Sequence, residues 1–172
     1  AEAEGALRQG DPARAEAIYR QMLSDNEADL EALKGLAVTL FLQQKYGEAL
    51  AVQEQVVAAD ALDVQTRLEL GFNYLNHQDR AEDAVTVFEE AAALDGSSKI
   101  LTFLAQAQEA AGHIADAEAT LRMAIDIDAA YAYPYSVLIG LFERNGRDAE
   151  AEEVRRAAEK NKAATATEMC GI

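Results

Sequence analysis

The stretch GHIADAEATLRMAIDID, from Gly112 to Asp128, has residue types that could bind a metal ion or exchange protons. It holds one of the two histidines of the chain and four acids: His113, Asp116, Glu118, Asp126 and Asp128. At a helical rise of 1.5 Å per residue, however, His113 and Asp126 lie roughly 20 Å apart. Metal ligands must converge within about 2 Å of one point, so we expect no metal site and no catalytic residue here.

The remaining residues offer no other arrangement typical of catalysis. His77 lies in a polar stretch, NHQD, that is typical of a turn between helices. The sequence contains no HExxH, GxGxxG, GxxxxGK[ST] or GxSxG motif, so zinc, nucleotide and serine-hydrolase sites are not indicated. The single cysteine, Cys170, allows neither an intrachain disulfide nor a cysteine metal cluster. We therefore expect a protein that is not an enzyme and that holds no cofactor.

Composition and charge narrow the class of partner. Of the 172 residues, 50% are hydrophobic, many of them alanine, and only two are proline, which favours helices. The net charge of −16 repels phosphate backbones and anionic membrane surfaces, so we expect no nucleic-acid partner. No apolar run approaches the roughly 18 residues of a membrane helix, so we expect no membrane insertion. A soluble protein is expected, with the cytoplasm favoured and the periplasm left open.

The sequence contains an internal repeat. Alanines followed by an apolar helix face recur at intervals of 33 to 35 residues: Ala15, Ala49, Ala84, Ala117 and Ala151. Each lies in an alanine-rich amphipathic segment that we predict to be a helix, over 13–23, 47–57, 82–92, 115–125 and 149–159. A short polar turn precedes each segment, and a repeat of this length is the mark of a helical array.

A second set of predicted helices lies before these turns. Apolar residues at three- and four-residue steps predict helices over 30–42, 66–76, 100–110 and 134–144. The predicted array of helix hairpins spans 1–163, in repeats over 1–26, 27–61, 62–96, 97–129 and 130–163. The first repeat has only a stub, AEAEGALRQG, for its first helix, which suggests truncation. Residues 164–172 are expected to form a flexible tail.

A helix–turn–helix period of 34 residues resembles the tetratricopeptide repeat (TPR) family. The third repeat fits best, with Leu70, Gly71 and Tyr74 in the family's L-G-x-x-Y element and Ala84 and Phe88 in A-x-x-x-F. The closing proline of the family is replaced by Glu27, Ala61, Gly96 and Ala129. The resemblance covers nearly the whole chain. It implies an all-α fold, a right-handed superhelical solenoid of antiparallel helix hairpins.

The resemblance also implies a binding surface, because the first helices of TPR proteins line a concave groove. The predicted partner-binding groove consists of the residues one step past the core face and two that border them: Lys34, Val38, Phe41, Leu42, Leu68, Phe72, Leu75, Thr102, Gln106 and Tyr133. Its part in the second and third repeats is apolar, and contiguous apolar surface usually marks a partner site. The alternative is that these side chains pack against a neighbouring repeat. A Lys/Asn clamp for a terminal carboxylate is not indicated, since Val38 stands where asparagine is needed.

The predicted function is a non-catalytic scaffold that binds a peptide or helix segment of a partner protein. The segment is expected to be apolar or amphipathic, and self-association to a homo-oligomer is left open. One alternative is a small acidic secretion-type chaperone, which this chain resembles in size, acidity and repeat type. It would hold an apolar client segment at Phe41 and Phe72. A third is a targeting module cut from a larger enzyme.

Overall fold

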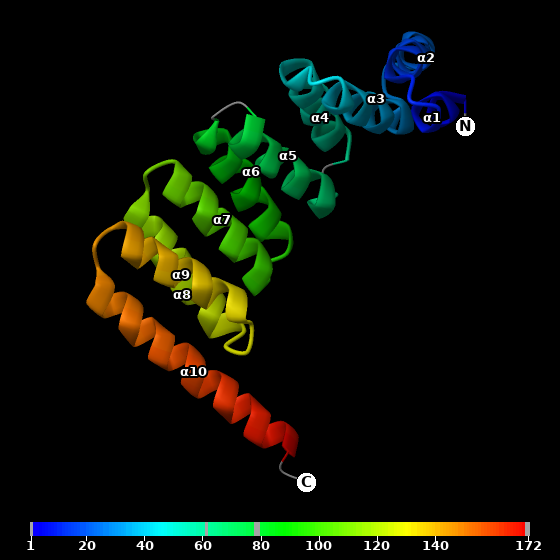
Figure 1. The fold of residues 1–172 in the computed structure, drawn as a ribbon. Helices are drawn as coiled ribbons and strands as arrows, with labels where there is room; N and C mark the ends of the chain where they lie inside the picture. Colours follow the sequence, from blue (N-terminus) through cyan, green and yellow to red (C-terminus); the bar gives the residue numbers. More distant parts are fainter. Residues whose placement is uncertain (1, 61, 78–79, 171–172) are drawn as a thin grey trace. The chain divides into compact units, whose positions relative to one another are not determined.

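The structure, a computed structural model, describes residues 2–60, 62–77 and 80–170, and every regular element within them is a helix (Figure 1). The chain divides into two compact bodies, Ala1–Arg80 and Ala81–Ile172, called the N-terminal and the C-terminal body below. Within the described ranges, no helix is long and apolar enough to cross a membrane. The all-α fold class expected from the sequence is confirmed.

The N-terminal body contains five helices: α1 (Glu2–Arg8), α2 (Pro12–Asp25), α3 (Leu30–Leu42), α4 (Tyr46–Ala59) and α5 (Val64–His77). Successive helices pack against each other, and α1 also contacts α3. In Figure 1 the chain reverses at each short turn, so α1–α2 and α3–α4 form hairpins. The first predicted stub is a helix of seven residues, whereas α3 has 13 residues and α5 has 14.

The C-terminal body contains the other five helices: α6 (Ala81–Leu94), α7 (Ser98–Ala110), α8 (Ile114–Ile127), α9 (Ala132–Arg144) and α10 (Asp148–Cys170). Helix α7 contacts α6, α8 and α9, and α9 contacts α10. Helices α7–α8 and α9–α10 therefore form two hairpins that stack through α7, α8 and α9 (Figure 1). The predicted repeat boundaries at 26, 61, 96 and 129 fall between helices, and the division into repeats remains a proposal.

Small side chains hold the two helices of a hairpin close together within each body. The repeated alanines are fully buried at 0% exposure in every case: Ala15, Ala49, Ala84, Ala117 and Ala151. Ala37 and Ala105 on the first helices are buried at 3% and 1%. Large apolar side chains such as Leu40 and Phe142, both 0% exposed, then fill the space beside these contacts. One methyl group at each alanine therefore sets the distance between helices.

One turn geometry joins first to second helices wherever the structure describes the whole turn. A residue with positive φ ends the first helix, with φ of 75° at Gly10, 61° at Gln44, 84° at Gly112 and 70° at Gly146. The next amide donates to the carbonyl five residues back, as in Lys45 N to Leu40 O (3.0 Å) and His113 N to Gln108 O (2.8 Å). This is the Schellman motif, which satisfies the last carbonyls of a helix. It also fixes the register between the two helices.

An acidic or amide side chain closes the second helices in place of the family's proline. The side-chain oxygens of Asn26, Asp60, Asp95 and Asp128 accept from the amide two residues on, at 3.3, 3.4, 3.0 and 3.0 Å. Such Asx turns stop a helix and reverse the chain without proline. These residues mark the ends of α2, α4, α6 and α8.

The C-terminal residues expected to form a flexible tail are helical in the structure as far as Cys170. Helix α10 continues through 164–170, and only 171 and 172 lie outside the described residues. The reason lies in the composition, since the NKAATATEM segment has no glycine or proline and three alanines that favour a helix. Flexibility of this segment stays a prediction.

Replacing Gln44 by glycine should stabilise the protein. A left-handed conformation costs a residue with a Cβ about 1–2 kcal/mol, and glycine avoids that cost at some loss of backbone entropy. We expect Gln44→Gly to raise the free energy of unfolding by about 0.5–1 kcal/mol in urea titrations. The matched variant Gly112→Gln should lower it by about 1 kcal/mol. A less stable Gln44→Gly protein would contradict the assignment of backbone strain to this turn.

Candidate functional site: an apolar hollow beside Val38

An open hollow of about 420 Å³ lies beside α3, α4 and α5 in the N-terminal body. We call it the Val38 hollow, and it is lined by Val38, Phe41, Leu42, Gln53, Glu69, Phe72 and Asn73. Four of the predicted groove residues, Val38, Phe41, Leu42 and Phe72, therefore meet at one place. Asn73 donates through Nδ2 to Gln53 Oε1 at 3.0 Å, so α5 and α4 are tied together at the edge of the hollow.

The apolar side chains of the hollow are left uncovered by the fold. Helix α3, LEALKGLAVTLFL, is apolar on almost every side, and its buried residues are Ala32, Leu33, Leu36, Ala37, Thr39 and Leu40. On the other side Val38 is 53% exposed and Leu42 is 62% exposed, while Phe41 and Phe72 are half-buried. A helix that is apolar all round is usually buried all round. Burial within the body therefore does not account for Val38 and Leu42.

Two further hollows of the same body share Val38. One of about 520 Å³ is lined by α1, α2 and α3 residues that include Leu7, Tyr19 and Gly35. Glycine is required there, because a Cβ on Gly35 would lie 2.2 Å from the Tyr19 ring. Burial, followed by the charges of Glu4 and Glu31, raises the pKa of Tyr19 above 10.0. Val38 also lines the third hollow, of about 180 Å³, so it stands at the centre of the candidate surface.

Lys34 ties α3 to the start of α5. Its Nζ lies 3.0 Å from Asp63 Oδ2. Asp63 also accepts from the Thr66 hydroxyl at 2.6 Å and from the Thr66 amide at 3.1 Å, which caps α5. The hydrogen bond from the Thr66 hydroxyl, together with those from Lys34 and the Thr66 amide, holds the pKa of Asp63 at about 2, against a burial effect in the other direction. Lys34 thus helps to position the wall of the surface.

Other predicted groove residues lie elsewhere. Leu68 is 8% exposed and Thr102 is 0% exposed, so both belong to the interior and not to an accessible surface. Thr102 turns its hydroxyl back to the Ser98 carbonyl at 2.7 Å, so this short side chain does not reach solvent. Leu75 is half-buried and does not line the Val38 hollow. Gln53 and Glu69 were not predicted, because Gln53 lies on a second helix and Glu69 interrupts the apolar pattern.

The remaining two predicted residues meet in the C-terminal body. Tyr133, 36% exposed, donates through its hydroxyl to Gln106 Oε1 at 3.1 Å. Its ring lies edge-on to Phe103 and Tyr131, with centroids 6.3 and 6.2 Å away. Tyr135 is 4% exposed and belongs to the core. Gln106 and Tyr133 therefore form part of an aromatic patch.

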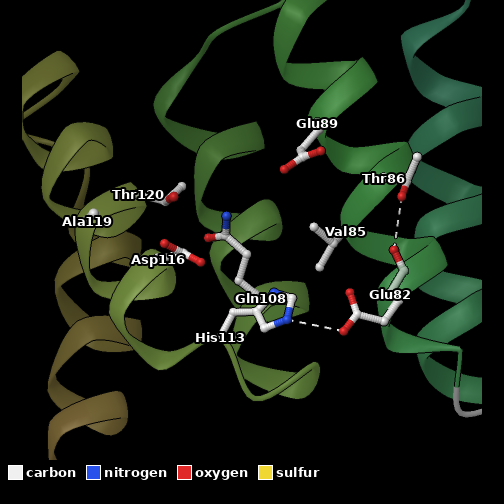
Figure 2. A pocket seen from close by; sticks show the side chains of 9 residues that line it. All are labelled: Glu82, Val85, Thr86, Glu89, Gln108, His113, Asp116, Ala119 and Thr120. Atoms are coloured by element: carbon white, nitrogen blue, oxygen red, sulfur yellow. Dashed lines mark hydrogen bonds and ion pairs between the residues drawn. The ribbon is translucent and has the colours of Figure 1, made fainter.

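The acids around His113 do not converge on it. His113 precedes α8 and lies 3.2 Å through Nε2 from Glu82 Oε1. Figure 2 shows it at the rim of an open pocket of about 570 Å³, with Asp116 and Glu89 along the walls. Asp126 and Asp128 are exposed at the other end of α8. Across the part of the chain that the structure describes, no group of three or more His, Cys, Asp or Glu residues could hold a metal ion.

The hairpins, their turns and their alanine contacts define a helical repeat protein. Residues 1–64 match the model of the tetratricopeptide repeat family, and the resemblance found in the sequence is confirmed. A comparison with curated proteins gives no match.

Solved structures of TPR proteins have the same fold. A crystal structure of MamA matches with a TM-score of 0.72 and 18% identity, over 96% of each chain. MamA from Desulfovibrio magneticus RS-1 matches at 0.71 and 17% identity, over 94% of this chain and 92% of its own. YrrB, a TPR protein with an unusual peptide-binding site, matches at 0.71 and 15% identity, over 94% of this chain and 83% of its own. At these identities the likeness concerns the fold alone.

The Asp63 cap should give the N-terminal body a pH-dependent stability. Since the pKa of Asp63 is about 2 in the folded chain and 3.8 in the free residue, its contribution is present above pH 3.8 and lost as pH falls towards 2. We expect Asp63→Ala to lower the free energy of unfolding by about 1 kcal/mol at pH 7. The difference from the parent chain should shrink across this window in urea titrations. A deficit that is the same at pH 7 and pH 2.5 would exclude an ionised Asp63 as its source.

Proposed function

We propose that this protein is a non-catalytic scaffold that binds a segment of a partner protein at the Val38 hollow. The observation that carries the proposal is the exposure of Val38 and Leu42, at 53% and 62%, next to half-buried Phe41 and Phe72. When a partner covers these side chains, each Å² of apolar surface removed from water stabilises the complex by about 25 cal/mol. A partner with apolar residues can supply that cover.

The fold supports this use of the surface. Repeat arrays of helix hairpins present extended surfaces on which other proteins bind. YrrB, which has this fold, is described as having a peptide-binding site. The proposed surface is centred on Val38 of α3, a first helix, and the resemblance to the TPR family implies a groove on such helices.

The occupant that fits best is one face of an amphipathic helix. The Val38 hollow is apolar at its centre, and polar Gln53, Glu69 and Asn73 stand at its edge. An amphipathic helix places apolar residues at i, i+3, i+4 and i+7 on the hollow and keeps its polar side in water. Glu31 and Glu69 border the three hollows around Val38, so basic residues flanking the apolar face would be favoured.

Charge substitutions in the hollow should weaken binding of such a helix. The probe is a synthetic amphipathic helical peptide with leucines at i, i+3, i+4 and i+7 and lysines on its other side. We expect Val38→Glu to weaken binding by about tenfold or more, because a carboxylate would be buried without a partner. Fluorescence anisotropy of the labelled peptide measures the affinity.

Met123 offers a matched control. It is 55% exposed on α8, in the C-terminal body, so Met123→Glu makes the same kind of change at equal exposure. Binding should be retained in this variant. Equal loss in both variants, or no loss in Val38→Glu, would refute the assignment of the Val38 hollow.

The alternative of a secretion-type chaperone predicts a different preference. A chaperone would bind an extended apolar peptide more tightly than a helical one, and Phe72→Glu would weaken that binding. Its support is the same exposed apolar surface in an acidic chain with a net charge of −16. Self-association predicts a mass that rises with concentration in light scattering, and a targeting module predicts an enzyme domain in the same gene.

A further inference from the structure

We propose that the open pocket between α6, α7 and α8 binds the guanidinium group of an arginine from another protein. This pocket, called the Glu89 pocket below, includes Glu82, Val85, Glu89, Gln108, His113 and Asp116 (Figure 2). It lies in the C-terminal body on the side of the second helices, and it does not depend on the proposed function of the Val38 hollow.

Within each of the two bodies, the described residues include one junction of the same kind that an arginine closes from within. Between α2 and α4, Arg20 Nε lies 2.9 Å from Glu16 Oε1, and Arg20 Nη2 lies 2.8 Å from Glu48 Oε2. Lys45 Nζ completes the group at 2.8 Å from Glu16 Oε2. Hydrogen bonds from Lys45, Arg20 and Gln43, the largest from Lys45, hold the pKa of Glu16 at about 2. Two cations and two carboxylates thus neutralise each other.

The junction between α8 and α10 repeats this arrangement at equivalent positions. Arg122 Nη2 lies 3.0 Å from Glu118 Oε1, and Arg147 Nη1 lies 2.6 Å from Glu118 Oε2. Arg147 also pairs with Glu150. Counted from the repeated alanines, Glu118 follows Ala117 as Glu16 follows Ala15, and Arg122 and Arg20 stand at the same place. A shared register therefore produces the same ion-pair group twice.

The Glu89 pocket occupies the corresponding place between α6 and α8, but the cations are replaced. Val85 follows Ala84 and so replaces the glutamate of the other two junctions. Glu89, five residues after Ala84, replaces their arginine. His113 stands where Lys45 and Arg147 stand, and its partner is the 70% exposed Glu82. Asp116 keeps the acidic position of Glu48 and Glu150. Among the residues that the structure describes, no basic side chain pairs with Glu89 or Asp116.

A buried acceptor provides a second and independent observation. Gln108 is 8% exposed, and its Oε1 has no hydrogen-bond partner in the described residues. Two equivalent residues at other turns, Leu40 and Phe142, are apolar and 0% exposed. Figure 2 shows the Gln108 amide directed into the pocket between Asp116 and Glu89. A buried polar atom without a partner is costly, so a donor from outside would be stabilised at this point.

A guanidinium group matches this set of acceptors best. It carries five N–H donors in a planar fork, which suits a pocket lined by the acceptors of Asp116, Glu89 and Gln108. A lysine ammonium presents three donors as a compact charge and matches a broad set of acceptors less well. Metal binding is not indicated by the side chains, since no metal-ligating group was found in the described parts of the chain. The ligand must therefore bring its own hydrogen-bond donors.

The arginine is assigned to a different protein because copies of this chain repel each other. Each copy carries a net charge of −16, which opposes close approach of two copies. A basic segment of another protein is attracted by the same field. The ligand class is thus an arginine within a polypeptide of positive charge.

The test uses short peptides and the full chain. The probe is acetyl-Gly-Ser-Arg-Ser-Gly-amide, compared with the same peptide carrying citrulline, a neutral isostere, and with free arginine. Binding is followed by NMR shifts of the backbone amides of Val85, Gln108 and Ala119. We expect saturable shifts with the arginine peptide, and at least about tenfold weaker binding with citrulline and with free arginine.

Glu89→Arg supplies the missing cation from within, because Asp116 stands at the position of Glu48, to which Arg20 pairs. This variant should lose the peptide by about tenfold or more, since an internal guanidinium occupies the pocket. The matched variant Glu153→Arg changes the same charge at an exposed position of α10 and should bind as the parent does. Asp116→Asn is a second pocket variant with the same expected loss, and circular dichroism confirms that each variant is folded.

Three results would overturn the proposal. They are shifts that do not saturate, citrulline binding equal to arginine binding, or full binding by folded Glu89→Arg. Free arginine that binds as tightly as the peptide would reject the assignment to another protein.

Discussion

The hairpins within each body depend on the close contact that their small side chains allow. The five repeated alanines are all at 0% exposure, and a larger side chain at any of them would force the two helices apart. Because the contact is the same each time, residues at equal offsets from it reach equivalent places. The core, the turns and the charged surface therefore all follow one register.

This register explains why the fold could be predicted from the sequence. The alanine period and the apolar steps gave the second helices and most first helices to within a few residues, because both signals report packing within a hairpin. The sequence predicts a flexible tail from residue 164, whereas α10 continues to Cys170 because alanine favours a helix there.

The candidate site was only partly predictable. Val38, Phe41, Leu42 and Phe72 meet as expected because they share one face within two neighbouring first helices. Leu68 and Thr102 hold the same offset as Lys34, yet they are buried whereas Lys34 is exposed. Exposure next to a core face depends on how the adjacent helix lies, and a single helix period does not contain that information. Gln53 reaches the hollow from a second helix, whereas the groove was expected on first helices alone.

The same register makes departures from the pattern informative. The α2–α4 and α8–α10 junctions carry neutral groups of ion pairs, whereas the α6–α8 junction carries Glu89 and Gln108 where those two have arginine and an apolar residue. Val38 and Leu42 depart from the pattern in the opposite way, because they are apolar side chains on a face where polar side chains are expected. Neither departure improves the packing of the body in which it lies. Both are understandable as surfaces that another protein completes.

Photocrosslinking from position 38 in the native host tests the central claim most directly. A benzoylphenylalanine at Val38 lies on the proposed binding surface, while the same residue at exposed Ala149 of α10 does not. The account predicts a discrete adduct with one partner protein from position 38, which a competing amphipathic helical peptide removes, and none from position 149. Equal adducts from both positions, or none from position 38, would contradict it.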